Sequence, residues 1–198
     1  SDLDFHQQTA DMAGVERRLA KTIGLGVMYG MGYNKMAREL DIDPQDAKKM
    51  LQDFRERVPF MQGMLEAVMN RANSKGIIRT LLGRKCRFDL WEPMAWGVHK
   101  ALPHNQAKVE YGDAIKRAGT YKALNRLIQG SAADQTKKAM VDVYEELGVV
   151  PLIQVHDELD CSVKSEKEAK EIQRVMETCV ELEVPSKADI DLGESWGG

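Results

Sequence analysis

Two adjacent carboxylates, Asp157 and Glu158, lie at the polar tip of a short apolar run. The run covers residues 152–155 and the chain returns through residues 161–163, a pattern typical of a β-hairpin over residues 151–163. Two neighbouring anions repel each other unless a cation lies between them. Because oxygen-only ligands suit Mg²⁺, the pair predicts a metal site with Asp157 and Glu158 as ligands. The alternative is a solvated turn with ordinary surface acids, since short motifs also occur by chance.

Four residues, Arg17, Lys21, Leu25 and Tyr29, recur at every fourth position of a segment with a helical pattern from residue 15 to residue 30. Four residues turn an α-helix by about 400°, so these side chains form one slowly winding stripe. Its two cations could bind a polyphosphate, and its apolar and aromatic end could stack against a sugar or a base. The alternative is that the two cations lie on a solvated face of the helix, while the apolar end of the stripe packs into the core.

Glycines are frequent in and just after this helix, at Gly24, Gly26, Gly30 and Gly32. Each costs roughly 1 kcal/mol relative to alanine inside a helix. They indicate either the close approach of another segment or a helix that must bend or move.

Asn125 and Gln129 lie one helical turn apart in a later segment of helical pattern. Their amides can share one face and suit the acceptors of a DNA minor groove, although amides on a solvated face are commoner. Gly130 and Ser131 interrupt the pattern, and Ser131 with Asp134 matches a capping box, so we expect a second helix to begin there.

The remaining elements are predicted from caps and breakers, which are the Asp43 cap, Pro59, Gly76, Gly148 and a capping box of Ser165 with Glu168. Expected helices cover residues 44–58, 60–73, 131–147 and 166–182, and expected strands cover residues 77–82, 86–88 and 188–192. Residues 91–112 have no clear period and predict a loop with short helical pieces. Together the elements predict an α+β fold, rich in helices, with one small antiparallel sheet from residues near 77–88, 151–163 and 188–192.

A basic turn at residues 83–85 joins the first two expected strands, with Arg84 in the turn and Arg79 in the strand before it. Such a turn is more often solvated than bound to a ligand, unless nucleic acid passes beside it.

The length of 198 residues suits one domain, or one domain with a substantial sub-lobe. Hydrophobic residues make up 43% and charged residues 30%, as in ordinary water-soluble proteins, and no apolar run is long enough to span a membrane. The cysteines, Cys86, Cys161 and Cys179, lack metal-ligand spacing, which indicates reduced thiols in a cytosol-like compartment.

The charges divide unevenly along the chain. Residues 151–198 hold 5 Lys or Arg and 12 Asp or Glu, whereas residues 1–150 hold 23 and 19. A basic part beside an acidic part fits a nucleic-acid groove next to a metal site, and it fits many other proteins as well.

The chain resembles the C-terminal part of family A DNA polymerases, the group of bacterial DNA polymerase I and many phage replicases. The resemblance covers nearly the whole chain and rests on three motifs in order, with a similar ending at residues 193–196. The motifs are Arg17-x3-Lys21-x3-Leu25-Gly26-x2-Tyr29-Gly30, similar to motif B of the fingers; Asn125-x3-Gln129-Gly130-Ser131-Ala132-Ala133-Asp134, similar to the palm segment at the primer–template minor groove; and Gln154-Val155-His156-Asp157-Glu158, similar to motif C.

For the incoming deoxynucleoside triphosphate (dNTP), the resemblance implies five contacts. Arg17 and Lys21 bind the triphosphate and His6 joins them. Lys21 also donates a proton to the leaving pyrophosphate. Leu25 and Tyr29 lie against the sugar and base of the nascent pair.

For metal and primer, the resemblance implies that Asp157 holds catalytic Mg²⁺ with Glu158 assisting. His156 and Gln154 contact the primer end. The implied reaction is DNA-directed DNA synthesis, in which a primer 3′-hydroxyl attacks the α-phosphate of a dNTP at a two-metal site.

For the duplex, the resemblance implies that Asn125 and Gln129 read the minor groove. Arg79 and Arg84 are implied contacts to the template or primer backbone. The implied partners are therefore primer–template DNA and dNTPs. The implied location is the cytoplasm, and a host cytoplasm if the source is viral.

The implied organisation has three parts. Residues 1–76 form fingers, with the nucleotide-binding helix at residues 15–30. Residues 77–119 form a fingers–palm connection with the basic hairpin. Residues 120–198 form the C-terminal palm with the metal-binding hairpin.

Three positions depart from the family pattern. Leu25 stands where many members have Phe or Tyr, so selectivity at the sugar 3′ position stays open. Gly24 replaces a usual Asn, and Tyr121 lies where bacterial members tend to have Arg.

The family also needs a motif A aspartate upstream of the fingers, and no matching segment precedes His6 in these residues. We therefore expect a truncated piece or one half of a split polymerase. It would be active only when completed by a second polypeptide with the thumb and motif A, which supplies the second carboxylate opposite Asp157.

Two other functions compete with the polymerase. One is a non-catalytic module that binds DNA or a partner chain. The other is a metal-dependent nuclease that uses Asp157, Glu158 and Asp160, which is disfavoured because motif B has no use in a hydrolase. The joint presence of four residues favours the enzyme: Arg17, Lys21, Tyr29 and Asp157.

Overall fold

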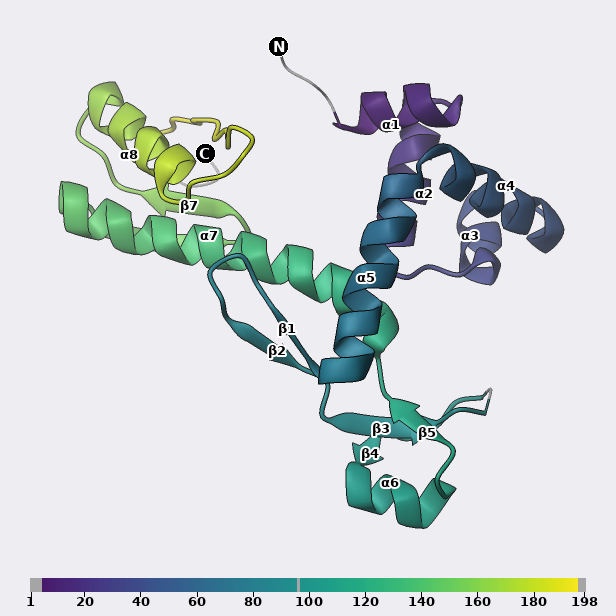
Figure 1. The fold of residues 1–198 in the computed structure, drawn as a ribbon. Coiled ribbons are helices and arrows are strands. Elements are labelled where there is room, and N and C mark those ends of the chain that lie inside the picture. Colours follow the sequence, from purple (N-terminus) through teal and green to yellow (C-terminus); the bar gives the residue numbers. More distant parts are fainter. Residues whose placement is uncertain (1–4, 96, 196–198) are drawn as a thin grey trace. The chain divides into compact units, whose positions relative to one another are not determined.

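The computed structural model describes residues 5–95 and 97–195 and confirms the predicted α+β class (Figure 1). Helices predominate, and the strand pairings among these residues are antiparallel. The chain divides into two compact units. The first holds the chain up to Arg79 together with Lys85–Leu127, and the second holds Thr80–Arg84 and the chain from Ile128 onward.

The first unit begins with helices α1 (Phe5–Ala13), α2 (Arg17–Met28), α3 (Tyr33–Leu40), α4 (Pro44–Arg57) and α5 (Pro59–Lys75). The start of α4, its junction with α5 and the end of α5 follow from the sequence, as predicted, whereas α1 and α3 were not predicted. The Asp43 carboxylate accepts a hydrogen bond from the Gln45 N–H and caps α4. Pro59 lacks an N–H, so it cannot continue α4 and begins α5 instead. Gly76, with φ of 68°, ends α5 in the left-handed conformation.

A core of apolar side chains joins α2, α3, α4 and the start of α5. Its fully buried members include Ile23, Met36, Val58 and Met61. Burying a side chain of this size stabilises the fold by about 1.5–3 kcal/mol. The face of α2 that carries Ile23 therefore packs into the core, and the opposite face remains accessible for other contacts.

Strands β1 (Ile77–Arg79) and β2 (Lys85–Arg87) follow α5 and form the predicted basic hairpin, with Arg79 opposite Lys85. The first strand ends at Arg79 rather than at the predicted residue 82, and Lys85 belongs to β2 rather than to the turn. A second sheet has the order β4–β3–β5 and comprises β3 (Leu90–Pro93), β4 (Leu102–Pro103) and β5 (Ile115–Arg117). Helix α6 (His104–Tyr111) packs beside this sheet (Figure 1).

Helix α6 confirms one short helical piece within residues 91–112, whereas strands β3 and β4 correct the prediction of a loop there. Arg117 explains how the sheet is held. Its Nε donates to the Asn73 carbonyl at 3.1 Å and its Nη1 donates to the Phe88 carbonyl at 2.8 Å. Its guanidinium also lies 4.7 Å from the centroid of the Trp91 ring. These partners are 26 or more residues away from Arg117, so no local pattern reveals them.

Helix α7 (Ala123–Leu147) follows a 3₁₀ turn, η1 (Thr120–Lys122), and runs unbroken through Gly130 and Ser131. The prediction that a second helix begins at Ser131 is therefore wrong. The Ser131 hydroxyl accepts a hydrogen bond from the Leu81 N–H at 3.0 Å instead of capping a helix. The predicted end is confirmed, because Gly148 has φ of 67° and its N–H donates to the Tyr144 carbonyl.

The turn between β1 and β2, Thr80–Arg84, is fastened to α7 within the second unit. Arg84 donates from Nε to Asp134 Oδ1 at 2.6 Å and from Nη2 to the Gly130 carbonyl at 2.8 Å. A Cβ on Gly130 would lie 2.9 Å from Thr80 Cγ2, so the close approach needs a glycine. Burial opposes ionisation of Asp134, but hydrogen bonds from Thr80 and Arg84 and the Arg84 charge outweigh burial and lower the pKa of Asp134.

The second unit continues with the hairpin of β6 (Pro151–Val155) and β7 (Glu158–Cys161) and with α8 (Glu166–Thr178). Its core contains Val143, Val149, Ile172 and Val175. None of the described helices combines the length and the apolar composition needed to cross a bilayer.

The start of α8 confirms the predicted capping box. The Ser165 hydroxyl accepts a hydrogen bond from the Glu168 N–H, and the Glu168 carboxylate accepts one from the Lys164 N–H. The helix ends at Thr178, four residues earlier than predicted.

Residues 188–192 do not form the predicted strand. They continue an irregular segment that is tied to α8, where the Ala188 N–H donates to the Glu177 carboxylate and the Gln173 amide donates to the Ala188 carbonyl. The prediction of one shared sheet is also wrong, since β1–β2 and β6–β7 are separate ladders. Alternation of apolar and polar residues specifies a face, but it does not specify the partner strand.

Replacing Asp134 tests how the turn Thr80–Arg84 is held against α7. We expect Asp134→Ala to lower the free energy of unfolding by about 1.5–3 kcal/mol at neutral pH, because charge-assisted hydrogen bonds to a buried group are lost. The pKa of Asp134 is lowered in the folded state. Its stabilisation is therefore complete above the unfolded-state pKa of about 3.9 and is lost as the pH falls through the folded-state pKa. Urea denaturation at pH 7 and in acid measures both effects.

Asp191→Ala, at an exposed acid of the same unit, is the matched control and should change stability little. A difference between wild type and Asp134→Ala that stays the same from pH 7 into strong acid would contradict the assignment.

Candidate functional site

Helix α2 keeps two chemically distinct faces. The buried face packs into the core through Ala20, Ile23, Gly24, Gly26 and Val27. On the predicted stripe, Arg17 and Lys21 are exposed, Leu25 is half-buried and Tyr29 is 43% exposed. The stripe is thus a surface of two cations that leads to an aromatic ring, arranged as the spacing of these residues predicts.

His6 lies in α1, which packs against α2. Its side chain is half-buried. The structure therefore brings the helix that carries His6 beside the helix that carries Arg17 and Lys21. A shared contact of these three side chains with a triphosphate stays a prediction.

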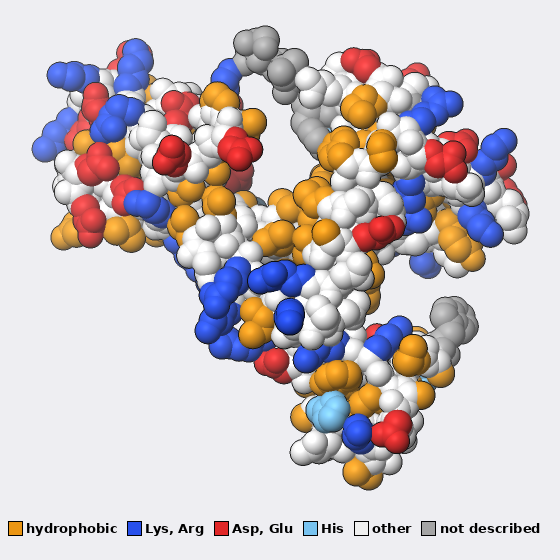
Figure 2. All heavy atoms as spheres, in the orientation of Figure 1, with side chains coloured by type: hydrophobic (Ala, Val, Ile, Leu, Met, Phe, Trp, Pro, Cys, Tyr) orange, Lys and Arg blue, Asp and Glu red, His pale blue; other side chains and the backbone are white. Residues whose placement is uncertain are grey.

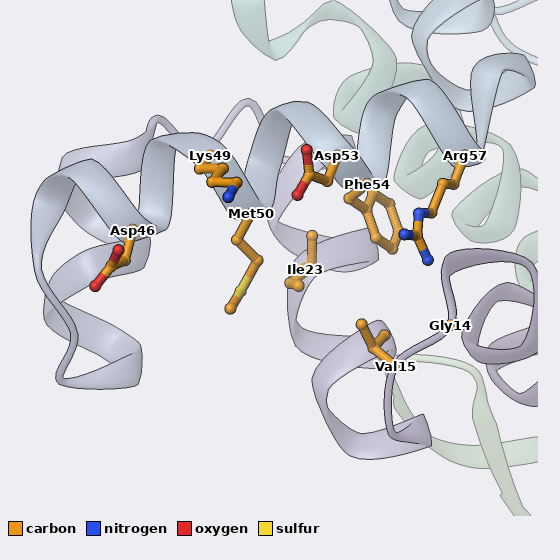
Figure 3. Close-up of a pocket in the computed structure, with 9 residues that line it drawn as sticks. All are labelled: Gly14, Val15, Ile23, Asp46, Lys49, Met50, Asp53, Phe54 and Arg57. Atoms are coloured by element: carbon orange, nitrogen blue, oxygen red, sulfur yellow. The ribbon is translucent and has the colours of Figure 1, made fainter.

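A cleft of about 340 Å³ opens on the core side of α2 (Figure 3). Figure 3 shows Phe54 and Arg57 of α4 facing Val15 and Gly14, the joint between α1 and α2. Ile23 from the buried face of α2 also lines the cleft. The cleft is therefore on the side of α2 away from the stripe, and it contains none of the predicted site residues.

The β6–β7 hairpin has the predicted turn. Val155 pairs with Glu158, so His156 and Asp157 form a two-residue connection. His156 has φ of 54° whereas Asp157 does not have a positive φ, a combination typical of a type II′ turn. The Gln154 side-chain amide donates to the His156 carbonyl and holds the turn. A histidine in this conformation stores backbone strain, which is commonest at functional sites.

Asp157 and Glu158 are both exposed at this turn. Their carboxylate oxygens are the hard ligands that Mg²⁺ prefers, so the pair fits part of a magnesium site. In residues 5–95 and 97–195, no group of three or more His, Cys, Asp or Glu side chains is gathered as a metal-binding cluster. Asp160, the third acid of the nuclease alternative, is half-buried with its Oδ2 enclosed.

The predicted minor-groove amides lie one turn apart on α7, with Asn125 half-buried and Gln129 exposed. Both amides precede Gly130 and lie in the first turns of α7. Their contact with DNA stays a prediction.

The β1–β2 hairpin carries a basic surface, which we define as Arg79, Lys85 and Arg87. All three side chains are exposed, and blue side chains gather over this hairpin in Figure 2. Arg79 was predicted as a DNA contact, whereas Lys85 and Arg87 were not. Arg79 and Lys85 flank the five-residue turn Thr80–Arg84 and pair with each other, and this symmetry was the signal that could have found Lys85.

Arg84 was predicted to contact the DNA backbone. In the structure, two of its guanidinium nitrogens donate hydrogen bonds to acceptors on α7. Its side chain remains 52% exposed. Its observed role is to hold the turn against α7, and its contact with DNA stays a prediction.

Comparison with known proteins places these features in a family. Residues 1–198 match the family model described as DNA polymerase family A. The chain is 37% identical over 228 residues to the DNA-directed DNA polymerase of Pseudomonas phage M6, covering 98% of this chain and 31% of that protein. It is 32% identical over 208 residues to the thermostable DNA polymerase I of Thermus thermophilus, covering 98% and 23%.

Among solved structures, the chain is similar to the POL domain of Pol1 from M. smegmatis in complex with DNA primer-template and dNTP. The TM-score is 0.69 at 30% identity, over 92% of this chain and 32% of that chain. The present chain therefore spans about a third or less of the length of these proteins.

The strained turn residue yields a stability test. We expect His156→Gly to raise the free energy of unfolding by about 1 kcal/mol, because glycine adopts a positive φ without the steric cost that histidine incurs. Asp157→Gly is the matched control on the same turn, where φ is not positive, and it should not stabilise the protein. Urea denaturation measures both, and equal effects of the two substitutions would show that His156 carries no strain.

Proposed function

Because this chain belongs to DNA polymerase family A, we propose that it supplies the nucleotide-binding helix and the metal-binding hairpin of a DNA-directed DNA polymerase. The observation that carries the proposal is the division of α2, which buries its apolar face and leaves Arg17, Lys21 and Tyr29 exposed on one stripe. Two cations one turn apart suit a chain of phosphates, and the aromatic ring beyond them suits a base.

In the proposed complex, Arg17 and Lys21 bind the triphosphate of the dNTP, with His6 from the neighbouring helix. The planar guanidinium of Arg17 can hold two phosphate oxygens, while the Lys21 ammonium acts as a compact charge. Lys21 donates a proton to the pyrophosphate as it leaves. Leu25 and Tyr29 contact the sugar and the base, so the half-buried Leu25 bears on sugar selectivity.

For the metal, we propose that Asp157 and Glu158 contribute ligands to Mg²⁺. When bound there, Mg²⁺ would lower the pKa of the primer hydroxyl and neutralise charge on the reacting phosphates. The exposed position of both carboxylates at a tight turn supports this role. His156 contacts the primer end, and Gln154 supports it by holding the His156 carbonyl.

For the duplex, we propose that Asn125 and Gln129 donate to minor-groove acceptors, which are similar for all correct pairs. Arg79 contacts the DNA backbone, together with Lys85 on the same hairpin. Arg84 contributes through the exposed part of its guanidinium and through the position of the turn.

In this proposal residues 1–76 act as fingers, residues 77–119 connect fingers and palm, and residues 120–198 act as the C-terminal palm. The division of the structure supports separate nucleotide and metal parts, since the stripe belongs to the first unit and the metal hairpin to the second. The similarity to a phage polymerase supports a location in the cytoplasm of a host cell.

We further propose that activity requires a thumb and a motif A carboxylate from outside residues 1–198, supplied by a longer chain or by a second polypeptide. Two-metal catalysis needs acids on both sides of the reacting phosphate. The β6 strand supports the proposal, because Leu152, Ile153 and Val155 are all exposed although apolar, at 65%, 42% and 38%. An exposed apolar strand is an edge that favours cover by another strand.

Primer extension tests the proposed function. The chain is assayed with Mg²⁺, primer–template DNA and dNTPs, alone and with the polypeptide that carries the thumb and motif A. We expect extension only in the completed enzyme, and we expect Asp157→Ala to reduce it by roughly a thousandfold or more because a metal ligand is lost. Asp191→Ala, at an exposed acid of the same unit, should leave the rate unchanged.

Extension by the chain alone would overturn the need for an outside carboxylate. No extension in either case, with DNA binding retained, would favour the non-catalytic binding module.

Lys21 offers a second test that concerns the nucleotide. We expect Lys21→Ala to raise the KM for dNTP by about tenfold and to lower kcat by about tenfold or more, since it removes both a phosphate contact and a proton donor. Lys35→Ala, at an exposed lysine of α3, is the matched control. Single-nucleotide incorporation over a range of dNTP concentrations separates the two effects, and an unchanged KM and kcat would remove Lys21 from the site.

A further inference from the structure

Helix α2 ends in a hydrogen-bonded C-terminal cap at Gly30. The Gly30 N–H donates to the Val27 carbonyl at 3.0 Å, and the Met31 N–H donates to the Gly26 carbonyl at 2.7 Å. These are the two hydrogen bonds of a Schellman motif, which favours a residue with positive φ, and Gly30 has φ of 71°. The path of the chain is thus fixed directly after Tyr29, the last residue of the stripe.

Tyr121 of η1 contacts this terminus within the first unit. A Cβ built on Gly30 would lie 2.9 Å from the Tyr121 carbonyl oxygen and 3.1 Å from Cδ2 of the Tyr121 ring. Both distances are shorter than ordinary van der Waals contact of a real Cβ. Gly30 therefore lacks a side chain for two reasons, its positive φ and the closeness of Tyr121.

The backbone of Tyr121 is anchored although its ring is accessible. Thr120 on one side and Ala123 and Leu124 on the other are buried, whereas the Tyr121 side chain is 47% exposed. Tyr121 cannot withdraw from Gly30 without uncovering these buried neighbours.

The contact joins two segments that have different roles in the proposed function. Tyr29 ends the helix that carries the nucleotide stripe, and Asn125 lies in the first turns of α7, four residues after Tyr121. All of these residues belong to the first unit. Any shift of the Gly30 terminus against Tyr121 would change the position of Tyr29 relative to Asn125.

We propose that Tyr121 is a positioning residue for nucleotide selection, which acts through Gly30 to set the position of Tyr29 relative to Asn125. This inference rests on the proposed function. Without the Tyr121 ring, the α2 terminus loses a contact on one side, and the base and sugar of a bound dNTP are held less firmly. The effect falls on nucleotide binding and discrimination, because Tyr121 is not itself among the groups assigned to the reacting atoms.

The first arm of the test is kinetic and uses the completed polymerase. We expect Tyr121→Ala to raise the KM for the correct dNTP by about tenfold, with kcat changed by less than about threefold, and to increase misincorporation. Tyr121→Phe keeps the ring and should stay within about twofold of wild type. Tyr144→Ala, at a tyrosine of α7 that is 59% exposed, is the matched control and should have no effect.

The second arm measures amide hydrogen exchange in the chain without DNA or nucleotide. We expect the Gly30 and Met31 amides to exchange about tenfold faster in Tyr121→Ala than in wild type, and at the wild-type rate in Tyr121→Phe. This arm does not depend on polymerase activity.

The outcomes separate the inference from the proposed function. If the wild-type completed enzyme does not extend a primer, the proposed function fails, and the positioning role fails with it even where exchange confirms the contact. If the wild type extends but Tyr121→Ala leaves the KM unchanged, the positioning role alone is overturned. The same holds if Tyr121→Phe is as defective as Tyr121→Ala, or if the exchange of Gly30 and Met31 is unaltered.

Discussion

The pairing of Arg84 with Asp134 is the interaction on which the path of the chain through the second unit depends. Asp134 is buried, and a buried charge is strongly destabilising unless it is paired and hydrogen-bonded. To reach it, the turn Thr80–Arg84 must approach α7 closely, which requires Gly130 to lack a side chain and engages the hydroxyl of Ser131. Residues that resemble a helix break are thus a contact surface on one continuous helix.

In the first unit, α2 is held in place and still leaves the charged side chains of its stripe accessible. The helix is fixed through its apolar face, where Ile23 and Val27 are fully buried, and at its end, where Gly30 closes against Tyr121. Desolvating Arg17 would be costly, so the cationic stripe remains in water on the opposite face. The core therefore determines the orientation of the stripe without contacting the charges themselves.

The β6–β7 hairpin carries two features that lower stability. Its turn places a strained His156 next to Asp157, and its first strand leaves apolar residues in water, including Leu152. Strain at a turn and an uncovered apolar edge both lower stability, so neither is expected in a segment whose only role is to connect two helices. Both features are accounted for if the carboxylates at the tip meet ligands, and the strand meets another strand, from outside these residues.

Features that depend on neighbouring residues could be predicted from the sequence: the caps at Asp43 and Ser165, the stripe that begins at Arg17, and the acidic turn at Asp157. Hydrogen bonds between residues a few positions apart and the 3.6-residue period are written locally. Long-range contacts settle how Ser131 is used, which strands share a sheet, and what lies against Gly30. Ser131, for example, could cap a helix or accept a hydrogen bond from the distant Leu81 N–H. A local pattern does not distinguish such alternatives, and the arrangement that buries more surface and pairs more polar groups prevails.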